Sequence, residues 1–286
     1  MKIVIDPGAG FCPGVEYTIH LAEELLQKHI DLYSLGSLIH NPSEISRLQQ
    51  LGMKSLEHSS LQDLKSPATI LIRAHGEPPA TFDRLREQNL AVIDGTCQIV
   101  RKSQNKVKSY SQRDYQVIFV GKKNHPEAIA IAGYCQKPMI IVEQPEDLEK
   151  IDPLQKTVVL AQTTISPKLF NSILKAMEEK GLDFVTENTI CKYIKKRDQD
   201  INQLAGESEV VIVVGGKKSA NTAVLYQQCR AVNSQTYWIE EPANLQKEWF
   251  DKVKQVGITG GTSTPRWMLE KVKRGIENLD GQWGDM

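Results

Sequence analysis

The sequence lacks the features that mark membrane, nucleic-acid-binding and secreted proteins. No apolar run approaches the roughly 20 residues that span a bilayer. The 35 basic and 35 acidic residues balance, so no basic surface for nucleic acid or anionic membranes is expected. The amino-terminal stretch 1–7 enters a strand pattern without the apolar core of a signal peptide. We therefore expect a cytoplasmic protein with no nucleic-acid or membrane partner.

Cysteine is also scarce, and its distribution argues against a disulfide framework. The 286 residues include five cysteines, an odd number, spaced tens of residues apart. Disulfide scaffolds are typical of short secreted chains, so metal binding or catalysis is the better use for cysteines in a chain of this length. Cys135 and Cys229 fall inside helical patterns, and we interpret both as small buried hydrophobic side chains.

Short β-branched runs alternate with amphipathic helical segments along the whole chain, without a Gly/Ser linker. Ten runs predict strands: 2–5, 31–34, 69–72, 91–93, 116–120, 139–142, 157–161, 210–214, 236–239 and 256–259. Helical patterns lie between them, for example at 16–28 and 169–180. This alternation predicts an α/β fold with mostly parallel sheets and right-handed crossovers.

Cys12, Cys97 and Cys191 each begin one copy of a threefold sequence repeat. A glycine that ends an apolar run follows each cysteine by 24 residues, a small polar or imidazole side chain follows by 28, and a third strand-end motif lies further on. The recurring positions are Gly36, Gly121 and Gly215; His40, His125 and Ser219; and His75, Thr163 and Ser263.

The repeat predicts three pseudo-threefold-related α/β domains around one central site. The boundaries that it indicates are residues 1–96, 97–190 and 191–266. A last helix over 267–280 is expected to close back onto the first domain. The length agrees with two or three domains of ordinary size.

Each of the three cysteines falls where a predicted strand gives way to a helix. Ligands of parallel α/β units collect outside the carboxyl ends of the strands, and a helix amino terminus favours the thiolate form of cysteine. Three thiolates are one fewer than a closed tetrahedral site needs. Such a centre keeps an open position, as catalytic zinc does, and an iron–sulfur cluster would keep one iron without a protein ligand.

Polar side chains at the predicted strand ends could surround a bound anion. Glu127 follows His125 and Pro126 at the start of a helix, where it either caps that helix or, if the loop faces the pocket, donates protons. The other candidates share a hydrogen-bonding side chain and suit a phosphate or diphosphate: His40, His75, His125, Thr163, Ser219, Asn221 and Ser263.

Nine motifs of the chain resemble, in order and spacing, those of the 4-hydroxy-3-methylbut-2-enyl diphosphate reductases, the LytB/IspH family. They run from the first predicted strand to the last helix: Gly10–Val15, Leu38–Asn41, Ala74–Gly76, Thr96–Cys97, His125–Glu127, Gln162–Thr164, Ile190–Cys191, Ser219–Asn221 and Gly257–Pro265.

The resemblance implies a cofactor, a reaction and a donor of electrons. The cofactor is one 4Fe–4S cluster held by Cys12, Cys97 and Cys191, with one open iron. The reaction removes the allylic hydroxyl of the substrate reductively and yields isopentenyl and dimethylallyl diphosphate, the last step of the non-mevalonate isoprenoid pathway. Electrons come singly from a ferredoxin or flavodoxin.

The resemblance also implies roles for single residues. Glu127 delivers protons with help from Thr163, which also contacts the substrate. Ala220 stands where the family has a second serine, so one contact to the diphosphate either comes from the backbone alone or is lost. The resemblance implies that the diphosphate is held by the remaining motif residues: His40, His75, His125, Ser219, Ala220, Asn221 and Ser263. A basic run follows Cys191, and Asp-Gly-Thr-Cys-Gln surrounds Cys97, where the family has other residues.

Two other functions stay open from the residues alone. A related three-cysteine 4Fe–4S enzyme could reduce, hydrate or dehydrate a different small substrate, but no arginine except Arg73 occupies a motif position that could clamp a carboxylate. A non-enzymatic protein stapled by zinc or a cluster would need a fourth ligand. Cys135 and Cys229 are out of phase with the repeat.

Overall fold

The computed structural model describes residues 1–64 and 67–281, except for the side chains of residues 194–199, 220, 280 and 281. The chain forms two compact units. Unit 1 contains residues 1–16, 39–47 and the chain from 192 onward, and unit 2 contains residues 17–38 and 48–191. Each unit is described by itself. None of the helices in the described ranges has the length and apolar character that a membrane span needs.

Within these ranges the strands form three four-stranded sheets, in which every pairing is parallel. The first sheet, in unit 2, has the order β3-β2-β4-β5: β3 Lys54–Leu56, β2 Leu32–Leu35, β4 Thr69–Ile72 and β5 Ala91–Asp94. The second, also in unit 2, has the order β7-β6-β8-β9: β7 Ile140–Val142, β6 Gln116–Val120, β8 Thr157–Ala161 and β9 Phe184–Glu187. The third, in unit 1, has the order β11-β10-β12-β1: β11 Thr236–Ile239, β10 Val210–Val214, β12 Gln255–Gly260 and β1 Lys2–Ile5. The predicted α/β fold with parallel sheets is confirmed.

Helices cover the sheets, as crossovers between parallel strands require. The central strands β8 and β10 are buried along their whole length, which explains their nearly continuous apolar sequences. The α-helices of the described chain are α1 Pro13–Gln27, α2 Pro42–Gln50, α3 Pro79–Glu87, α4 Gln98–Gln112, α5 Pro126–Ala132, α6 Pro167–Glu179, α7 Lys192–Glu207, α8 Ala220–Val232 and α9 Arg266–Gly281.

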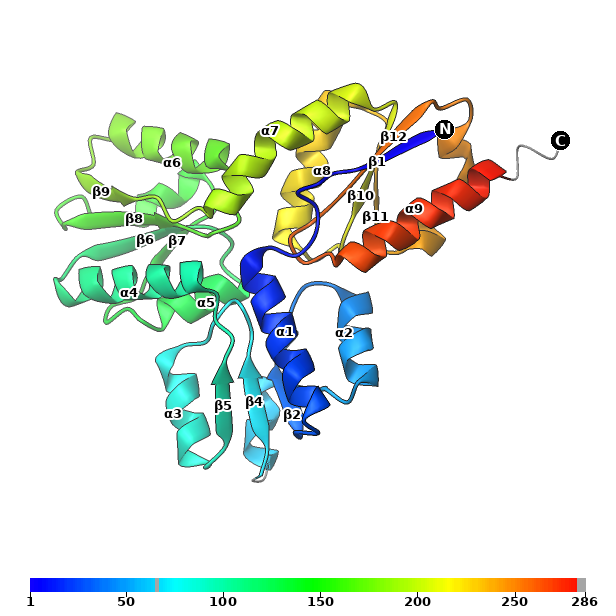
Figure 1. The fold of residues 1–286 in the computed structure, drawn as a ribbon. Coiled ribbons are helices and arrows are strands. Elements are labelled where there is room, and N and C mark those ends of the chain that lie inside the picture. Colours follow the sequence, from blue (N-terminus) through cyan, green and yellow to red (C-terminus); the bar gives the residue numbers. More distant parts are fainter. Residues whose placement is uncertain (65–66, 282–286) are drawn as a thin grey trace. The chain divides into compact units, whose positions relative to one another are not determined.

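The amino-terminal strand belongs to the sheet of the carboxyl-terminal strands. β1 pairs with β12 in the register Lys2↔Gln255 to Ile5↔Ile258, and Figure 1 shows the blue strand beside the orange one. α9 packs on this sheet through Met268 and Leu269. The sequence prediction grouped β1 with residues 1–96, because a strand–helix repeat carries no mark of which strand is its first. The predicted domain boundaries stay a prediction.

The same strand order occurs in all three sheets, and the repeating glycines have the same role in each. The three glycines directly follow β2, β6 and β10. Each donates its backbone N–H to the last carbonyl of the neighbouring edge strand, β3, β7 or β11. The pairs are Gly36 N to Leu56 O (2.7 Å), Gly121 N to Val142 O (3.0 Å) and Gly215 N to Ile239 O (3.0 Å). The threefold repeat of the sequence is therefore a repeat of structure.

Candidate functional site

Each repeat cysteine lies between an edge strand and a helix: Cys97 follows β5, Cys191 follows β9 and Cys12 follows β1. Its backbone N–H bonds to a carbonyl in the loop after the neighbouring strand of the same sheet, β4, β8 or β12. The three bonds are Cys97 N to Ala74 O (3.0 Å), Cys191 N to Thr163 O (2.9 Å) and Cys12 N to Thr262 O (3.2 Å). These loops carry the third recurring motif of the sequence, so each sheet places one cysteine next to one set of polar candidates.

Unit 2 brings Cys97, Cys191 and Glu127 close enough to interact electrostatically. Burial raises the pKa of the Cys97 thiol, and the nearby Cys191 and Glu127 raise this pKa further. The backbone N–H groups of Ile99 and Val100, in the first turn of α4, oppose the shift by binding the sulfur. A partly desolvated thiol with N–H donors ready for its anion suits a metal ion, whose charge would stabilise the thiolate.

The carboxylate of Glu127 is buried, with an exposed fraction of 1%. Its Oε1 accepts a hydrogen bond from the backbone N–H of Thr163, and its Oε2 accepts one from the Thr163 hydroxyl, both at 2.7 Å. Burial raises the pKa of Glu127 to about 7, although the two bonds from Thr163 lower this pKa. Capping alone does not require such burial. A carboxyl group with this pKa is partly protonated at neutral pH.

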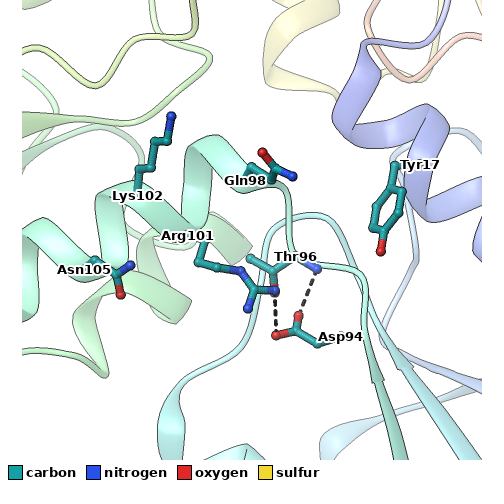
Figure 2. Close-up of a pocket in the computed structure, with 7 residues that line it drawn as sticks. All are labelled: Tyr17, Asp94, Thr96, Gln98, Arg101, Lys102 and Asn105. Carbon is teal, nitrogen blue, oxygen red and sulfur yellow. Dashed lines mark hydrogen bonds and ion pairs between the residues drawn. The ribbon is translucent and has the colours of Figure 1, made fainter.

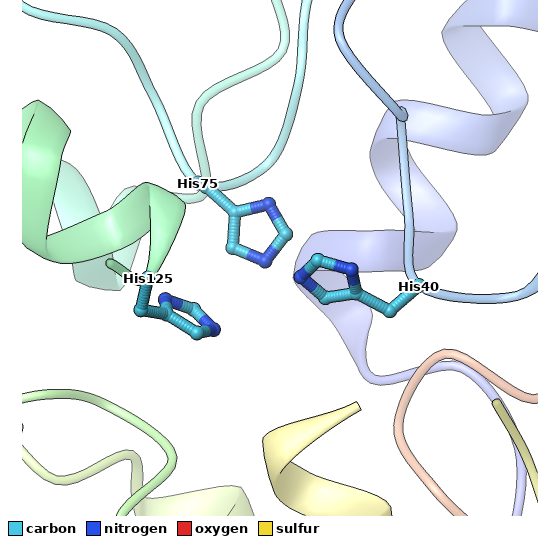
Figure 3. Close-up of side chains that lie close together, drawn as sticks. All are labelled: His40, His75 and His125. Atoms are coloured by element: carbon cyan, nitrogen blue, oxygen red, sulfur yellow. The ribbon is translucent and has the colours of Figure 1, made fainter. Parts of the chain in front are cut away.

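His125 caps α5, and this bond decides its tautomer. Its Nδ1 accepts a hydrogen bond from the backbone N–H of Glu127 at 3.2 Å. A neutral imidazole that accepts at Nδ1 carries its proton on Nε2. The ring of His75 lies edge-on to that of His125, with 5.3 Å between the centroids (Figure 3). Unit 2 therefore brings two of the predicted anion-binding histidines together, and a neutral His125 ring carries its proton on Nε2.

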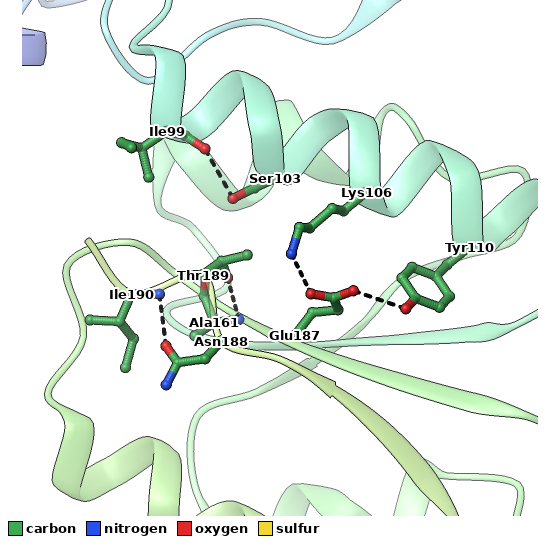
Figure 4. A network of polar contacts seen from close by, with 9 residues as sticks. All are labelled: Ile99, Ser103, Lys106, Tyr110, Ala161, Glu187, Asn188, Thr189 and Ile190. Atoms are coloured by element: carbon green, nitrogen blue, oxygen red, sulfur yellow. Dashed lines mark hydrogen bonds and ion pairs between the residues drawn. The ribbon is translucent and has the colours of Figure 1, made fainter. Parts of the chain in front are cut away.

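The loop before Cys191 is held by a polar network (Figure 4). The Thr189 hydroxyl bonds to both the N–H and the carbonyl of Ala161, at the end of β8. Just upstream, Glu187 accepts bonds from Lys106 and, at 2.9 Å, from the hydroxyl of Tyr110, both on α4. Two elements of unit 2 thus fix the approach to Cys191.

Arg73 is committed to a buried carboxylate. Its guanidinium lies 2.9 Å from Oε1 of Glu77, which is 2% exposed. The other carboxylate oxygen of Glu77 lies 2.8 Å from Nε2 of His58. Gly36 makes room for this arrangement, since a Cβ there would lie 3.0 Å from Arg73 Nη1. Sequence reasoning assigned no role to Glu77, because the burial that requires its partners is not visible in a local motif.

In unit 1, Cys12 and Asn221 are joined through one residue. The backbone carbonyl of Thr262 accepts from Cys12, and its N–H donates to Asn221 Oδ1 at 2.8 Å. The amide Nδ2 of Asn221 is the group left to donate to an anion. Ser219 caps α8, and its Oγ accepts from the Thr222 N–H at 3.2 Å. Ser219 and Asn221 therefore lie at the amino terminus of α8, where the sequence predicted the start of a helix.

Three further candidates also belong to unit 1. His40 lies on the loop between β2 and α2, and its carbonyl sits so close to Gly216 that a Cβ at Gly216 would lie 2.4 Å from it. His40 is therefore next to the loop that leads into α8. Ser263 follows β12 and is half-buried. Ala220 begins α8, but its side chain and those of residues 194–199, in the basic run after Cys191, lie outside the described part.

Neither of the other two cysteines suits a metal. Burial raises the pKa of the Cys135 thiol to about 11, which keeps it protonated at neutral pH. Cys229 is fully buried in a hydrophobic cluster of α7, α8 and β10. Cys229 matches its prediction as a small buried side chain in a helix. The prediction for Cys135 is wrong, because α5 ends at Ala132 and Cys135 lies beyond it, only half-buried. Cys12, Cys97 and Cys191 are also half-buried, and none of the five cysteines is in a disulfide.

Fold and junctions together define a class: α/β proteins with three equivalent parallel sheets, each followed by a cysteine at a strand–helix junction. Comparison with known proteins identifies the family within that class. The family model described as "LytB protein" matches residues 3–277. The chain belongs to the LytB family, whose members bind an iron–sulfur cluster.

Named relatives agree over almost the full length. The 4-hydroxy-3-methylbut-2-enyl diphosphate reductase of Chlorobium phaeovibrioides is 38% identical, covering 97% of this chain and 99% of its own. That of Aquifex aeolicus is 39% identical, covering 99% and 98%. A solved structure of (E)-4-hydroxy-3-methyl-but-2-enyl diphosphate reductase, the terminal enzyme of the non-mevalonate pathway, is 38% identical with a TM-score of 0.73, covering 97% of this chain and 100% of that one.

Proposed function

We propose that this chain reduces 4-hydroxy-3-methylbut-2-enyl diphosphate, the compound named in its relatives. The allylic C–O bond breaks, a C–H bond forms and the oxygen leaves as water, with two electrons and two protons consumed. The products are isopentenyl and dimethylallyl diphosphate, which differ in the carbon that receives the proton.

The observation that carries this proposal is the buried Glu127. A carboxyl group whose pKa is about 7 is half protonated at neutral pH and is suited to protonate a leaving hydroxyl or an allylic carbon. The two bonds from Thr163 hold the carboxylate in one orientation. Glu127 also lies near enough to Cys97 to affect its pKa, so the proton donor and the thiol are neighbours in unit 2.

Cys12, Cys97 and Cys191 would hold one 4Fe–4S cluster. When bound, this cluster supplies electrons and a Lewis-acidic iron to the substrate oxygen. The half-buried thiols, with backbone N–H groups directed at Cys97, suit that role. A ferredoxin or flavodoxin would deliver the electrons one at a time.

Neutral donors would bind the diphosphate. His125 offers Nε2–H, Asn221 its Nδ2 amide and Ser219 its hydroxyl at the amino terminus of α8, where the helix dipole favours an anion. His40, His75, Thr163, Ser263 and the backbone of Ala220 complete the proposed set.

A carboxylic acid substrate, as a hydratase of this cofactor class would use, is less well supported. Such a substrate requires a bidentate arginine, and Arg73 is already paired with Glu77. The same chemistry on a different small phosphorylated compound is the remaining alternative.

The test is anaerobic purification with iron and sulfide counts, followed by turnover with reduced methyl viologen. We expect about four irons per chain, as one 4Fe–4S cluster requires, and formation of both products. Cys12→Ser, Cys97→Ser and Cys191→Ser should each lower the iron content, whereas Cys135→Ser should not. Zinc without sulfide, or a loaded cluster without turnover of this substrate, would overturn the proposal.

A further inference from the structure

A cavity of about 320 Å³ opens on unit 2 beside the loop that carries Cys97 (Figure 2). It lies between α1, the end of β5 and the first two turns of α4. Its lining includes Tyr17, Asp94, Thr96, Gln98, Arg101 and Lys102. The site described above does not use these side chains.

The rim of this cavity carries excess positive charge and an exposed aromatic ring. The lining residues of α4 include two basic side chains and no acidic one: Arg101 and Lys102. Arg101 is neutralised by Asp94, at 2.8 Å. Lys102 is exposed, and it pairs with no acidic side chain of the described chain. Tyr17 lines the same cavity from α1, with 54% of its surface exposed.

This surface is rigidly attached to the cysteine loop. The Thr18 hydroxyl donates to the carbonyl of Gly95 at 2.9 Å, and a Cβ on Gly95 would lie 2.9 Å from Thr18 Cγ2 on α1. α1 can therefore approach the loop only because residue 95 is glycine. Asp94 Oδ1 also accepts from the N–H of Thr96 at 2.9 Å. Tyr17 is thus held at a fixed place relative to Cys97.

The rim is also close to Cys97 along the chain. Cys97 is the residue that precedes α4, and Lys102 follows it by five residues, about 7.5 Å along the helix axis. Electrons for the proposed reaction arrive singly from a carrier too large to enter the protein. A carrier that rests on this rim would have a short path to a cysteine-bound cofactor.

We propose that the surface formed by Tyr17, Gln98 and Lys102 is the docking site of an acidic electron-carrier protein. The inference rests on the proposed function. Each docking event oxidises the carrier by one electron, so two events supply the two electrons of one turnover. Opposite charges steer such encounters, electron-transfer interfaces are small, and tyrosine is among the residues enriched at interfaces.

The test compares Lys102→Glu with the matched control Lys108→Glu. Both lysines are exposed on α4, but Lys108 lies about 9 Å further along the helix axis. Turnover of the holoenzyme is measured with reduced methyl viologen and with a reduced acidic [2Fe–2S] ferredoxin. Binding of the oxidised ferredoxin is measured by calorimetry at low salt, and Tyr17→Ser is included as an uncharged variant.

We expect Lys102→Glu to raise both the KM and the Kd for ferredoxin about tenfold, the size of one lost charge contact, and to flatten the salt dependence. Lys108→Glu should change either constant less than twofold, and viologen turnover should stay the same in both variants.

Equal effects of the two lysine substitutions, or a parallel loss of viologen turnover, would overturn the proposal that this surface is the docking site. Wild-type protein that turns over with viologen but does not bind ferredoxin overturns it as well and leaves the proposed function intact. If viologen turnover fails, the proposed function fails, and the calorimetric comparison still decides the docking site.

Discussion

Thr163 donates two hydrogen bonds to the carboxylate of Glu127, one from its backbone N–H and one from its hydroxyl, each at 2.7 Å. Two bonds from one residue fix both the position and the plane of the carboxylate. They stabilise its charged form, whereas burial opposes that form more strongly. The balance leaves a proton donor that works near neutral pH.

The Glu127 pKa should respond to the Thr163 hydroxyl. In the metal-free protein, carboxyl carbon NMR of Glu127 should show titration near pH 7. Thr163→Val removes the hydroxyl bond, which lowers the pKa, and should therefore shift the midpoint upward. Thr163→Ser keeps the hydroxyl and should stay close to wild type. Titration of wild type near the ordinary carboxyl value of 4.5 would contradict the assignment.

Breaking the buried Arg73–Glu77 pair should destabilise unit 2. Arg73→Leu leaves a carboxylate that is 2% exposed without its arginine partner, which costs about 3 kcal/mol. The double variant Arg73→Leu/Glu77→Leu should recover most of this loss. Urea unfolding of the metal-free protein measures both.

The control for this pair is Arg86→Leu. Arg86 binds Asp83 at the surface, where both side chains are mostly exposed, so the cost should stay below about 1 kcal/mol. An equal cost for Arg73→Leu and Arg86→Leu would show that the buried pair adds no stability.

Gly76, beside His75, should tolerate no side chain. Its φ is +75°, and a Cβ there would lie 2.5 Å from Gln104 Nε2 and 3.1 Å from Thr96 Cγ2. Gly76→Ala therefore adds a steric clash to the backbone strain of about 1–2 kcal/mol. It should push on the loop of Cys97 and lower the iron content.

Gly181→Ala is the matched control for Gly76→Ala. Gly181 has a φ of +70° and nothing within 4 Å of its Cβ position, so it carries the strain alone. We expect Gly181→Ala to bind iron like wild type and Gly76→Ala to unfold at a lower urea concentration. Equal unfolding midpoints would mean that Gln104 and Thr96 move aside freely.

The central strands could be predicted from sequence because they are buried on both faces and read as apolar runs, as in β8 and β10. β3 and β9 were missed because they are short edge strands with exposed residues. The pairing of β1 with β12 depends on contacts between distant parts of the chain, which local patterns do not encode.

For the site, the repeat indicated the cysteines and the strand-end polar residues. It could not decide whether Glu127 merely caps α5, because that depends on burial by β8 and its following loop. The pairing of Arg73 was invisible for the same reason: Glu77 meets Arg73 and His58 only after β4 and the segment at 58–63 are packed.

The most direct test of the account compares wild type with Glu127→Gln, both with the cluster loaded, in anaerobic turnover of 4-hydroxy-3-methylbut-2-enyl diphosphate by reduced methyl viologen. Glutamine keeps the shape and can still accept the bond from the Thr163 N–H, while its amide NH2 can donate to the Thr163 hydroxyl, but it has no acidic proton to deliver. We expect equal iron and sulfide contents, isopentenyl and dimethylallyl diphosphate from wild type, and a rate at least about 100-fold lower in the variant. Undiminished turnover in Glu127→Gln would show that the proton comes from elsewhere and would contradict the account.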